Sequence, residues 1–235
     1  AGAIAEKFLK QLNISVTAYA KSIGPVEVSP ERMDLSEIPN NQFCLPDADS
    51  AKEAEHYLDQ KIAECDSVGG VVESVISGLP AGLGEPVFEK LDANLAKAIL
   101  SIGAVKGFEI GDGFAATKAC GSENNDEFRM DGDKIVKETN HAGGVRDGSA
   151  VIFRAAFKPT PSIAKSQETV TKDGENIDLV IHGRHDPVVV PRAVVVVESM
   201  AAITAMDMLL MSMTSRLDLI QMFFQVENVD DSPEQ

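Results

Sequence analysis

The sequence predicts a single domain of the α+β class. Helical and strand-like segments alternate along the chain, but glycine-marked turns and a hairpin pattern favour α+β over a doubly wound parallel sheet. The length of 235 residues suits one large domain, and no break in composition divides it. We therefore expect one domain over residues 1–224. Residues 225–235 (QVENVDDSPEQ) are acidic and polar, and we expect a disordered tail there.

Helices are predicted where apolar residues recur at helical spacing. We expect them at 3–12, 51–65, 86–102 and 192–224. Ser50 precedes the second helix and Glu53 follows three residues later, which is the pattern of a capping box. Pro86 fits the first turn of the third helix, whose apolar face would include Phe88.

Strands are predicted where β-branched residues cluster or valines alternate. We expect them within 14–28, which a bend at 23–25 interrupts, and at 68–80, 104–113 and 150–157. Residues 168–181 read as a hairpin that turns at Lys172, Asp173 and Gly174. The polar stretches at 29–49 and 115–133 are expected to be connections.

The charge balance excludes several classes of partner. Lys and Arg number 21 against 37 Asp and Glu, a net charge of −16, which argues against non-specific binding to nucleic acid or to an anionic membrane. Aromatic residues make up only 5%, which argues against a stacking platform for single strands. The most apolar stretch, 188–211, contains Arg192, Glu198 and Asp207, so we expect no membrane span. A local basic pocket for an anionic small molecule remains allowed.

The cysteines indicate a reducing compartment. The chain has three cysteines, an odd number, and they lie far apart in the sequence: Cys44, Cys65 and Cys120. No CxxC pair occurs. Neither a disulfide framework nor a zinc site is indicated, and we expect a cytoplasmic protein.

Residues 157–163 (FKPTPSI) follow a predicted strand and carry groups that can hold a phosphate. Lys158 supplies a point charge, Thr160 and Ser162 supply hydroxyls, and two prolines stiffen the loop. The alternative interpretation is a proline turn with an exposed lysine.

Residues 182–191 (HGRHDPVVVP) place two histidines, an arginine and an aspartate within five positions. Arg184 can bind an anion through two hydrogen bonds, and Asp186 could act as a general base or orient one. An Arg184–Asp186 turn pair is the structural alternative. A metal site is disfavoured because no third ligand stands at suitable spacing.

Two further features have structural and functional interpretations. Glycines at 140–144 (NHAGG) could bring backbone amides close to a ligand, although ordinary turns are the default. Neither GxGxxG nor a P-loop occurs. The last predicted helix contains Met200, Met206, Met208, Met211 and Met213, and its apolar circumference favours an oligomer interface over a cofactor site.

Several of these motifs, in this order, resemble the C-terminal two-thirds of the chorismate synthase family. The segments are CDSVGGVVE, GLPAGLGEPVFEKLDANLAKAILSIGAVKGFEIGDGF, NHAGG, FKPTPSI and GRHDPVVVPRAVVVVES. The resemblance covers the chain from its start to about residue 213. It implies a β-α-β sandwich fold and a homotetramer. It also implies a lyase that removes phosphate from 5-enolpyruvylshikimate 3-phosphate to give chorismate and that requires reduced FMN.

The resemblance also assigns site residues. Gly103 and Ala104 match a flavin-contacting pair, and Arg184 matches an arginine at the flavin and substrate site. Asp186 matches an aspartate that helps to deprotonate flavin N5. The flavin-binding loop of the family is matched by Lys158, Pro159, Thr160, Pro161 and Ser162.

The sequence departs from the family pattern in two places. The family continues the glycine stretch as NHAGGxxGGxxxG, whereas VRDGS follows here, so Gly143 is expected as a flavin contact in a shortened loop. The family's N-terminal third, with two catalytic histidines, substrate-binding arginines and a serine-rich flavin loop, has no counterpart in this sequence. We therefore expect this fragment alone to be inactive. The alternative is a non-catalytic flavin-binding or oligomerisation module on the same scaffold.

Overall fold

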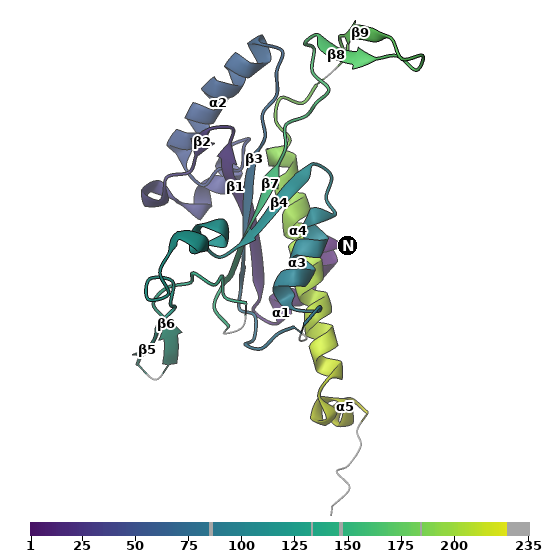
Figure 1. Ribbon diagram of the computed structural model, residues 1–235. Coiled ribbons are helices and arrows are strands. Elements are labelled where there is room, and N and C mark those ends of the chain that lie inside the picture. The colour runs from purple at the N-terminus through teal and green to yellow at the C-terminus, as the bar shows by residue number, and fades with distance from the viewer. Residues whose placement is uncertain (85–86, 133, 146–147, 184, 225–235) are drawn as a thin grey trace, which may run out of the picture.

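The computed structural model describes residues 1–84, 87–132, 134–145, 148–183 and 185–224. Its centre is a five-stranded antiparallel sheet with the strand order β2-β1-β3-β7-β4 (Figure 1). The strands are β1 (Ser15–Ile23), β2 (Val26–Glu27), β3 (Gly70–Ser77), β4 (Val105–Ile110) and β7 (Val151–Phe157). The α+β class is confirmed. The expected tail at 225–235 lies outside the described residues.

Three helices lie together on one face of this sheet (Figure 1). They are α1 (Gly2–Gln11), α3 (Leu91–Leu100) and α4 (Val190–Thr214). α4 packs against β1 and β3 and also contacts α1 and α3. α2 (Ala48–Ala63) lies away from this group, beside β2. The described residues therefore supply one large β layer and one helical layer.

Small side chains gather where α4 crosses the sheet. Ala18 of β1 and Ser74 of β3 are cross-strand partners, and both are buried. On the helix, Ala201, Ala202 and Ala205 are completely buried. Side chains of this size let the helix axis approach the strands closely, so α4 forms the centre of the core.

The opposite face of the sheet carries a polar row. Tyr19, Glu73, Arg154 and Glu109 are successive partners across β1, β3, β7 and β4. The Tyr19 hydroxyl donates a hydrogen bond to Glu73 Oε1 at 2.6 Å, and Arg154 Nη2 lies 3.4 Å from Glu109 Oε2. Burial, and then the hydrogen bond to Glu73, raises the pKa of Tyr19 above its ordinary range. These contacts tie four strands together on the face away from α4.

The predicted boundaries of two helices are wrong. α2 begins at Ala48, not after Ser50, because the Asp47 carboxylate caps it and accepts hydrogen bonds from Asp49 N–H and from Ser50 Oγ. α3 begins only at Leu91. A backbone bridge between Gly84 and Lys90 keeps the preceding residues out of the helix.

Phe88, expected on the apolar face of α3, is instead 84% exposed, and Pro86 lies outside the described residues.

The predicted helix at 192–224 is two helices. α4 ends at Thr214, and α5 runs over Leu217–Phe223. The hydroxyls of Thr214 and Ser215 donate to the carbonyls of Met211 and Ser212 in the last turn of α4. Such side-chain bonds compete with continuation of the helix.

The remaining segments form short elements. The predicted hairpin is confirmed as β8 (Gln167–Val170) and β9 (Asn176–Leu179), which extends away from the sheet (Figure 1). Short 3₁₀ helices and a second hairpin lie in and beside the expected connections. These are η1 (Pro30–Arg32), η2 (Leu35–Asn40), η3 (Gly113–Lys118), β5 (Phe128–Asp131) and β6 (Lys134–Lys137).

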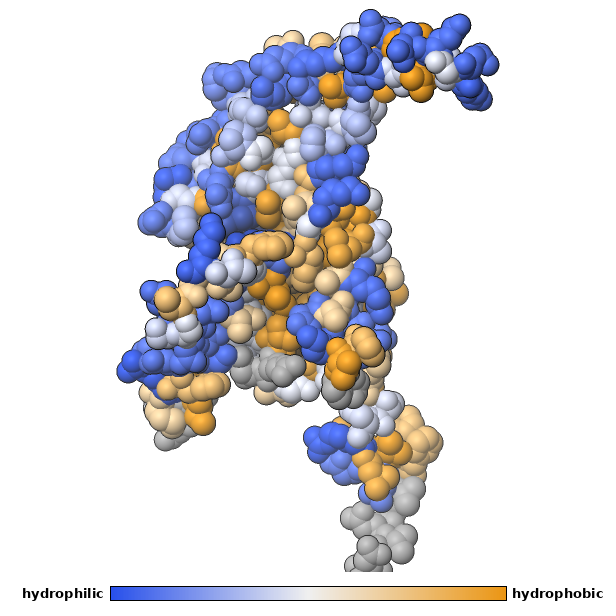
Figure 2. Space-filling view, viewed as in Figure 1, coloured by the Kyte–Doolittle hydropathy of each residue, from blue (hydrophilic) through white to orange (hydrophobic). Residues whose placement is uncertain are grey.

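α4 also leaves apolar side chains on the surface. Val195 and Met213 are 60% and 47% exposed, whereas Met208 is buried in the core of the chain. Figure 2 shows hydrophobic residues along α3, α4 and α5 and hydrophilic ones over α2 and the β8–β9 hairpin. By length and composition alone α4 could cross a membrane, but 44% of its most apolar stretch is buried inside the fold.

The half-buried Glu198 of α4 gives the fold a predictable pH dependence. Burial, and then the charge of Glu6 on α1, raises its pKa from 4.5 to about 7. Burial, and then the charge of Glu198, raises the pKa of the Cys44 thiol. Because the folded-state pKa exceeds the unfolded one, Glu198 favours the folded state at acidic pH, and this stability is lost as the pH rises from about 4.5 to 7.

We predict that Glu198→Gln raises the melting temperature at pH 8 by a few degrees and changes it much less at pH 4.5. Solvent screens this half-exposed carboxylate, so we count about one pKa unit of its shift, or about 1.4 kcal/mol, and 1 kcal/mol shifts the melting temperature by roughly 2–4 °C at this chain length. Circular dichroism melts at the two pH values measure this, with Glu53→Gln on exposed α2 as the control. An equal gain at both pH values would contradict the titration of Glu198.

Candidate functional site

The predicted flavin residues meet at the end of the sheet where β7 finishes and β4 begins. The antiparallel pairing of Val105 with Phe157 places Ala104 beside Lys158. The Lys158 N–H donates to the Ala104 carbonyl at 3.0 Å. Ala104 has a φ of +71°, a left-handed conformation that turns the chain into β4. The structure thus brings Gly103 and Ala104 next to the predicted flavin loop.

The loop after β7 presents its polar groups to solvent. Lys158 is exposed, and no carboxylate of the described residues pairs with it. Thr160 and Ser162 are half-buried, and Pro159 and Pro161 alternate with them. One free ammonium beside two hydroxyls on a stiff loop suits an anionic group such as a phosphate. The sheet end therefore offers donors that suit an anionic group of a ligand.

Asp186 lies just before α4 and has an unpredicted partner. Its Oδ2 accepts a hydrogen bond from Arg192 Nη1 at 2.5 Å, and a third of its side chain remains exposed. Arg184 lies outside the described residues, so the alternative of an Arg184–Asp186 turn pair is not tested. The neighbouring His185 ring nitrogen Nε2 lies 3.0 Å from the Ile181 carbonyl. The carboxylate of Asp186 is thus oriented by α4 while one side stays open.

Residues 66–69, at the start of β3, touch both of these segments. Ser67 Oγ donates to the Thr160 carbonyl at 2.6 Å, and Val68 N–H donates to the Pro187 carbonyl at 2.8 Å. Sequence reasoning assigned no function to Asp66, Ser67 or Val68, although CDSVGG was one of the family segments. The two consecutive glycines were the available signal, because they indicate a close approach of backbones.

Gly143 lies at the opposite end of β4. It has a φ of +74°, and a Cβ there would lie 2.6 Å from the Gly111 nitrogen, just past the end of the strand. Gly111 lies seven positions beyond Ala104, which corresponds to roughly 23 Å along a strand. The structure therefore does not place Gly143 beside Lys158.

The turn that contains Gly143 is held by buried carboxylate contacts that the sequence did not reveal. Asp126 accepts hydrogen bonds from the N–H groups of His141 and Ala142 and from Thr139 Oγ1. Burial acts to raise the pKa of Asp126, but these bonds and Lys137 lower it to about 2. Asp112 Oδ2 lies 2.7 Å from His141 Nδ1. His141 is therefore a structural residue of the turn.

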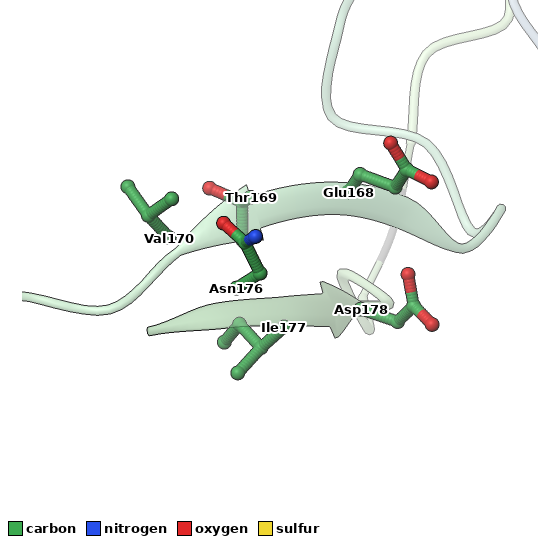
Figure 3. Close-up of a pocket in the computed structure, with 6 residues that line it drawn as sticks. All are labelled: Glu168, Thr169, Val170, Asn176, Ile177 and Asp178. Atoms are coloured by element: carbon green, nitrogen blue, oxygen red, sulfur yellow. The ribbon is translucent and has the colours of Figure 1, made fainter. Parts of the chain in front are cut away.

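The hollows on the surface differ in what they can bind. One of about 190 Å³ lies behind the flavin loop, lined by Ile62, Cys65, Asp66, Ile163, Ala164, His185 and Pro187. A larger one, of about 450 Å³, is lined by β8 and β9 among the described residues (Figure 3). There the cross-strand partners Glu168 and Asp178 lie side by side, which disfavours an anionic ligand. Among the described residues, no cluster of three or more His, Cys, Asp or Glu side chains could hold a metal ion.

Comparison with known proteins agrees with the resemblance drawn from the motifs. The chorismate synthase family model matches residues 1–210. The chorismate synthase of Agathobacter rectalis is 59% identical over 96% of this chain, and that of Lachnoclostridium phytofermentans is 56% identical over 96%. The chain spans 62% and 63% of those two relatives. A crystal structure of chorismate synthase superposes with a TM-score of 0.75 at 28% identity, over 95% of this chain and 65% of that one. The chain therefore belongs to the chorismate synthase family.

Proposed function

We propose that this chain is the flavin-binding part of a chorismate synthase. The proposed reaction breaks the bond between carbon and the phosphate oxygen of 5-enolpyruvylshikimate 3-phosphate and removes the C6 proton, giving chorismate and inorganic phosphate without net redox change. The observation that carries the proposal is the meeting of Ala104, the Lys158 loop and the segment of Asp186 at one end of the sheet.

The residues present fit FMN at this position. Among the described residues no carboxylate pairs with Lys158, and no atom beyond the chain neighbours lies within 4 Å of a Cβ placed on Gly103, so the backbone there is open to a ligand. Thr160 and Ser162 add hydroxyl donors. Reduced FMN, when bound, would supply an electron transiently and a nitrogen, N5, that exchanges a proton. Lys158 would bind the anionic end of the cofactor, and Gly103 and Ala104 would contact it through their backbone.

Asp186 is the proposed proton-transfer residue. Arg192 holds one of its oxygens, which orients the carboxylate and leaves it partly exposed. A fixed carboxylate of this kind can accept a proton from flavin N5 and release it to solvent. Arg184 and Gly143 are retained as proposed contacts on the strength of the resemblance.

We also propose a cytoplasmic homo-oligomer. Cys44, Cys65 and Cys120 are free thiols, which agrees with a reducing compartment. The apolar outer surface of α4 favours association with a second copy of the chain. An oligomerisation or flavin-binding module without catalysis is the alternative, and the activity measurement below separates the two.

The first functional prediction concerns FMN binding. We expect the unmodified chain to bind FMN weakly, with a dissociation constant above the micromolar range. Lys158→Ala should weaken binding a further tenfold to hundredfold, because a charged hydrogen bond contributes about 1.5–3 kcal/mol. Quenching of FMN fluorescence measures both values. Lys172→Ala in the β8–β9 turn is the matched control, and an equal loss there would show that the effect is not local.

The second concerns turnover. We predict that Asp186→Asn lowers kcat by about 10²–10⁴-fold, the usual contribution of general acid–base assistance. Flavin affinity should change little, because the amide keeps the shape of the carboxylate. The assay joins this chain to the N-terminal part of the Agathobacter rectalis relative and follows chorismate formation anaerobically with reduced FMN. Full kcat in Asp186→Asn would reduce Asp186 to the structural partner of Arg192.

The third concerns assembly. Met208 is 2% exposed, so its substitution would disturb the core, whereas Val196 is 41% exposed. Val196→Glu should dissociate the oligomer, because association would bury an unpaired charge. Multi-angle light scattering measures the mass, with Val170→Glu on the β8–β9 hairpin as the control. A stable monomer of the unmodified chain at high concentration would contradict the proposal.

A further inference from the structure

Residues 66–69 form a short connection between the end of α2 and the beginning of β3. α2 ends at Ala63, and Cys65 turns the chain in a left-handed conformation with a φ of +56°. The connection then runs past the flavin loop and past the segment before α4. It is the one stretch of the described chain for which hydrogen bonds to both are recorded.

Two side chains of this connection hold the flavin loop and the residues just after it. Ser67 Oγ donates to the Thr160 carbonyl at 2.6 Å, in the middle of the loop. Asp66 Oδ2 accepts from Lys165 Nζ at 2.5 Å, three residues after the end of the loop. The bond from Lys165, and then the Ser67 N–H, lowers the pKa of Asp66. The carboxylate therefore stays charged in the neutral range, and the connection holds the loop through Ser67 and the residues just after the loop through Asp66.

Gly69 holds the beginning of the same loop by close backbone contact. A Cβ at position 69 would lie 2.2 Å from the Phe157 carbonyl oxygen and 3.2 Å from the Pro159 nitrogen. Both neighbours are backbone atoms, which cannot move aside as a flexible side chain can. Any larger residue at 69 must therefore displace the loop that carries Lys158.

Val68, which lies between Ser67 and Gly69, contacts the segment that contains Asp186. Val68 N–H donates to the Pro187 carbonyl at 2.8 Å, and Val68 forms a parallel bridge with Val188. Pro187 directly follows Asp186. A displacement of the connection would therefore change the position of the flavin loop relative to Asp186.

We propose that Ser67 is a positioning residue, whose hydroxyl fixes the 158–162 loop on the connection. In this position of the loop, Lys158 and Asp186 can both act on the same bound flavin. This inference rests on the proposed function, because it assumes that the loop binds FMN. Ser67 touches neither cofactor nor substrate in this assignment, and it acts through the Thr160 carbonyl.

The test compares Ser67→Ala with Ser67→Thr in the unmodified chain background. Ser67→Ala should weaken FMN binding about five- to tenfold, the range expected for one hydrogen bond. Ser67→Thr keeps the hydroxyl and should restore most of the affinity. Hydrogen exchange of the amides at 158–165 should become several-fold faster in Ser67→Ala, because the loop loses one tether.

Ser212→Ala is the matched control. It removes a hydroxyl that donates to the Leu209 carbonyl at 2.8 Å near the far end of α4. That position is 22 residues beyond Val190, or roughly 33 Å along the helix. It should change neither FMN affinity nor exchange in the loop.

The outcomes separate this inference from the proposed function. Unchanged FMN affinity in Lys158→Ala would refute the flavin site, while faster exchange in Ser67→Ala would still show the tether. Loss of affinity in Lys158→Ala with none in Ser67→Ala would refute the positioning role alone. A fall in melting temperature of Ser67→Ala without faster exchange at 158–165 would likewise refute it, because the hydroxyl would then serve general stability.

Discussion

The close packing of α4 on the middle of the sheet is the constraint on which the rest of the structure depends. Alanines on the helix are buried, as are Ala18 and Ser74 on the two strands that α4 packs against, so the helix can lie close to the sheet. Val190, at the start of α4, is completely buried, and its Cγ2 would lie 3.0 Å from a Cβ at Gly70. The position of α4 on the sheet therefore determines where the preceding segment, which contains Asp186, contacts the start of β3.

The strand pairing then determines which residues can act together. β4 and β7 are antiparallel neighbours, so the residue before β4 and the residue after β7 must lie at the same end of the strand pair. This single relation brings Ala104 to Lys158, although 54 positions separate them in the sequence. The same pairing places Gly143 at the opposite end of β4, in the turn that the hydrogen bonds of Asp126 hold. A ligand that touched both Lys158 and Gly143 would have to extend along the whole of β4.

The sequence predicted most elements because their patterns are local. Alternating valines and helical spacing identified the strands of the sheet and the existence of the long helices. The boundaries failed where a distant or side-chain contact decided them. Asp47 rather than Ser50 caps α2, and the Gly84–Lys90 bridge delays α3. The end of α4 depends on hydroxyls bonding back to carbonyls, an effect weaker than the apolar pattern around it.

The site was predictable in its residue types but not in its supports. The lysine and hydroxyls of FKPTPSI indicate an anion site on chemistry alone, and the resemblance added the flavin. The contacts of Ser67 and Asp126 could not be read from the sequence, because each joins residues more than ten positions apart and leaves no periodic signal. The pairing of Asp186 with Arg192 was missed for a different reason: Arg184 stood nearer in sequence and offered the same charge.

The supports of the flavin loop have a consequence for binding strength. The loop is ordered by contacts with Ala104, Ser67, Gly69 and Gln167, and Asp66 holds Lys165 just after it. A loop that is already ordered loses little conformational entropy when a ligand binds, so its few donors act at nearly their full strength. The affinity of this chain for FMN is then set by how many donors it offers, and not by a cost of ordering the loop. The sheet end orients Lys158 without donors from any other segment. Further donors from another segment would therefore add binding energy to a site whose geometry is already fixed.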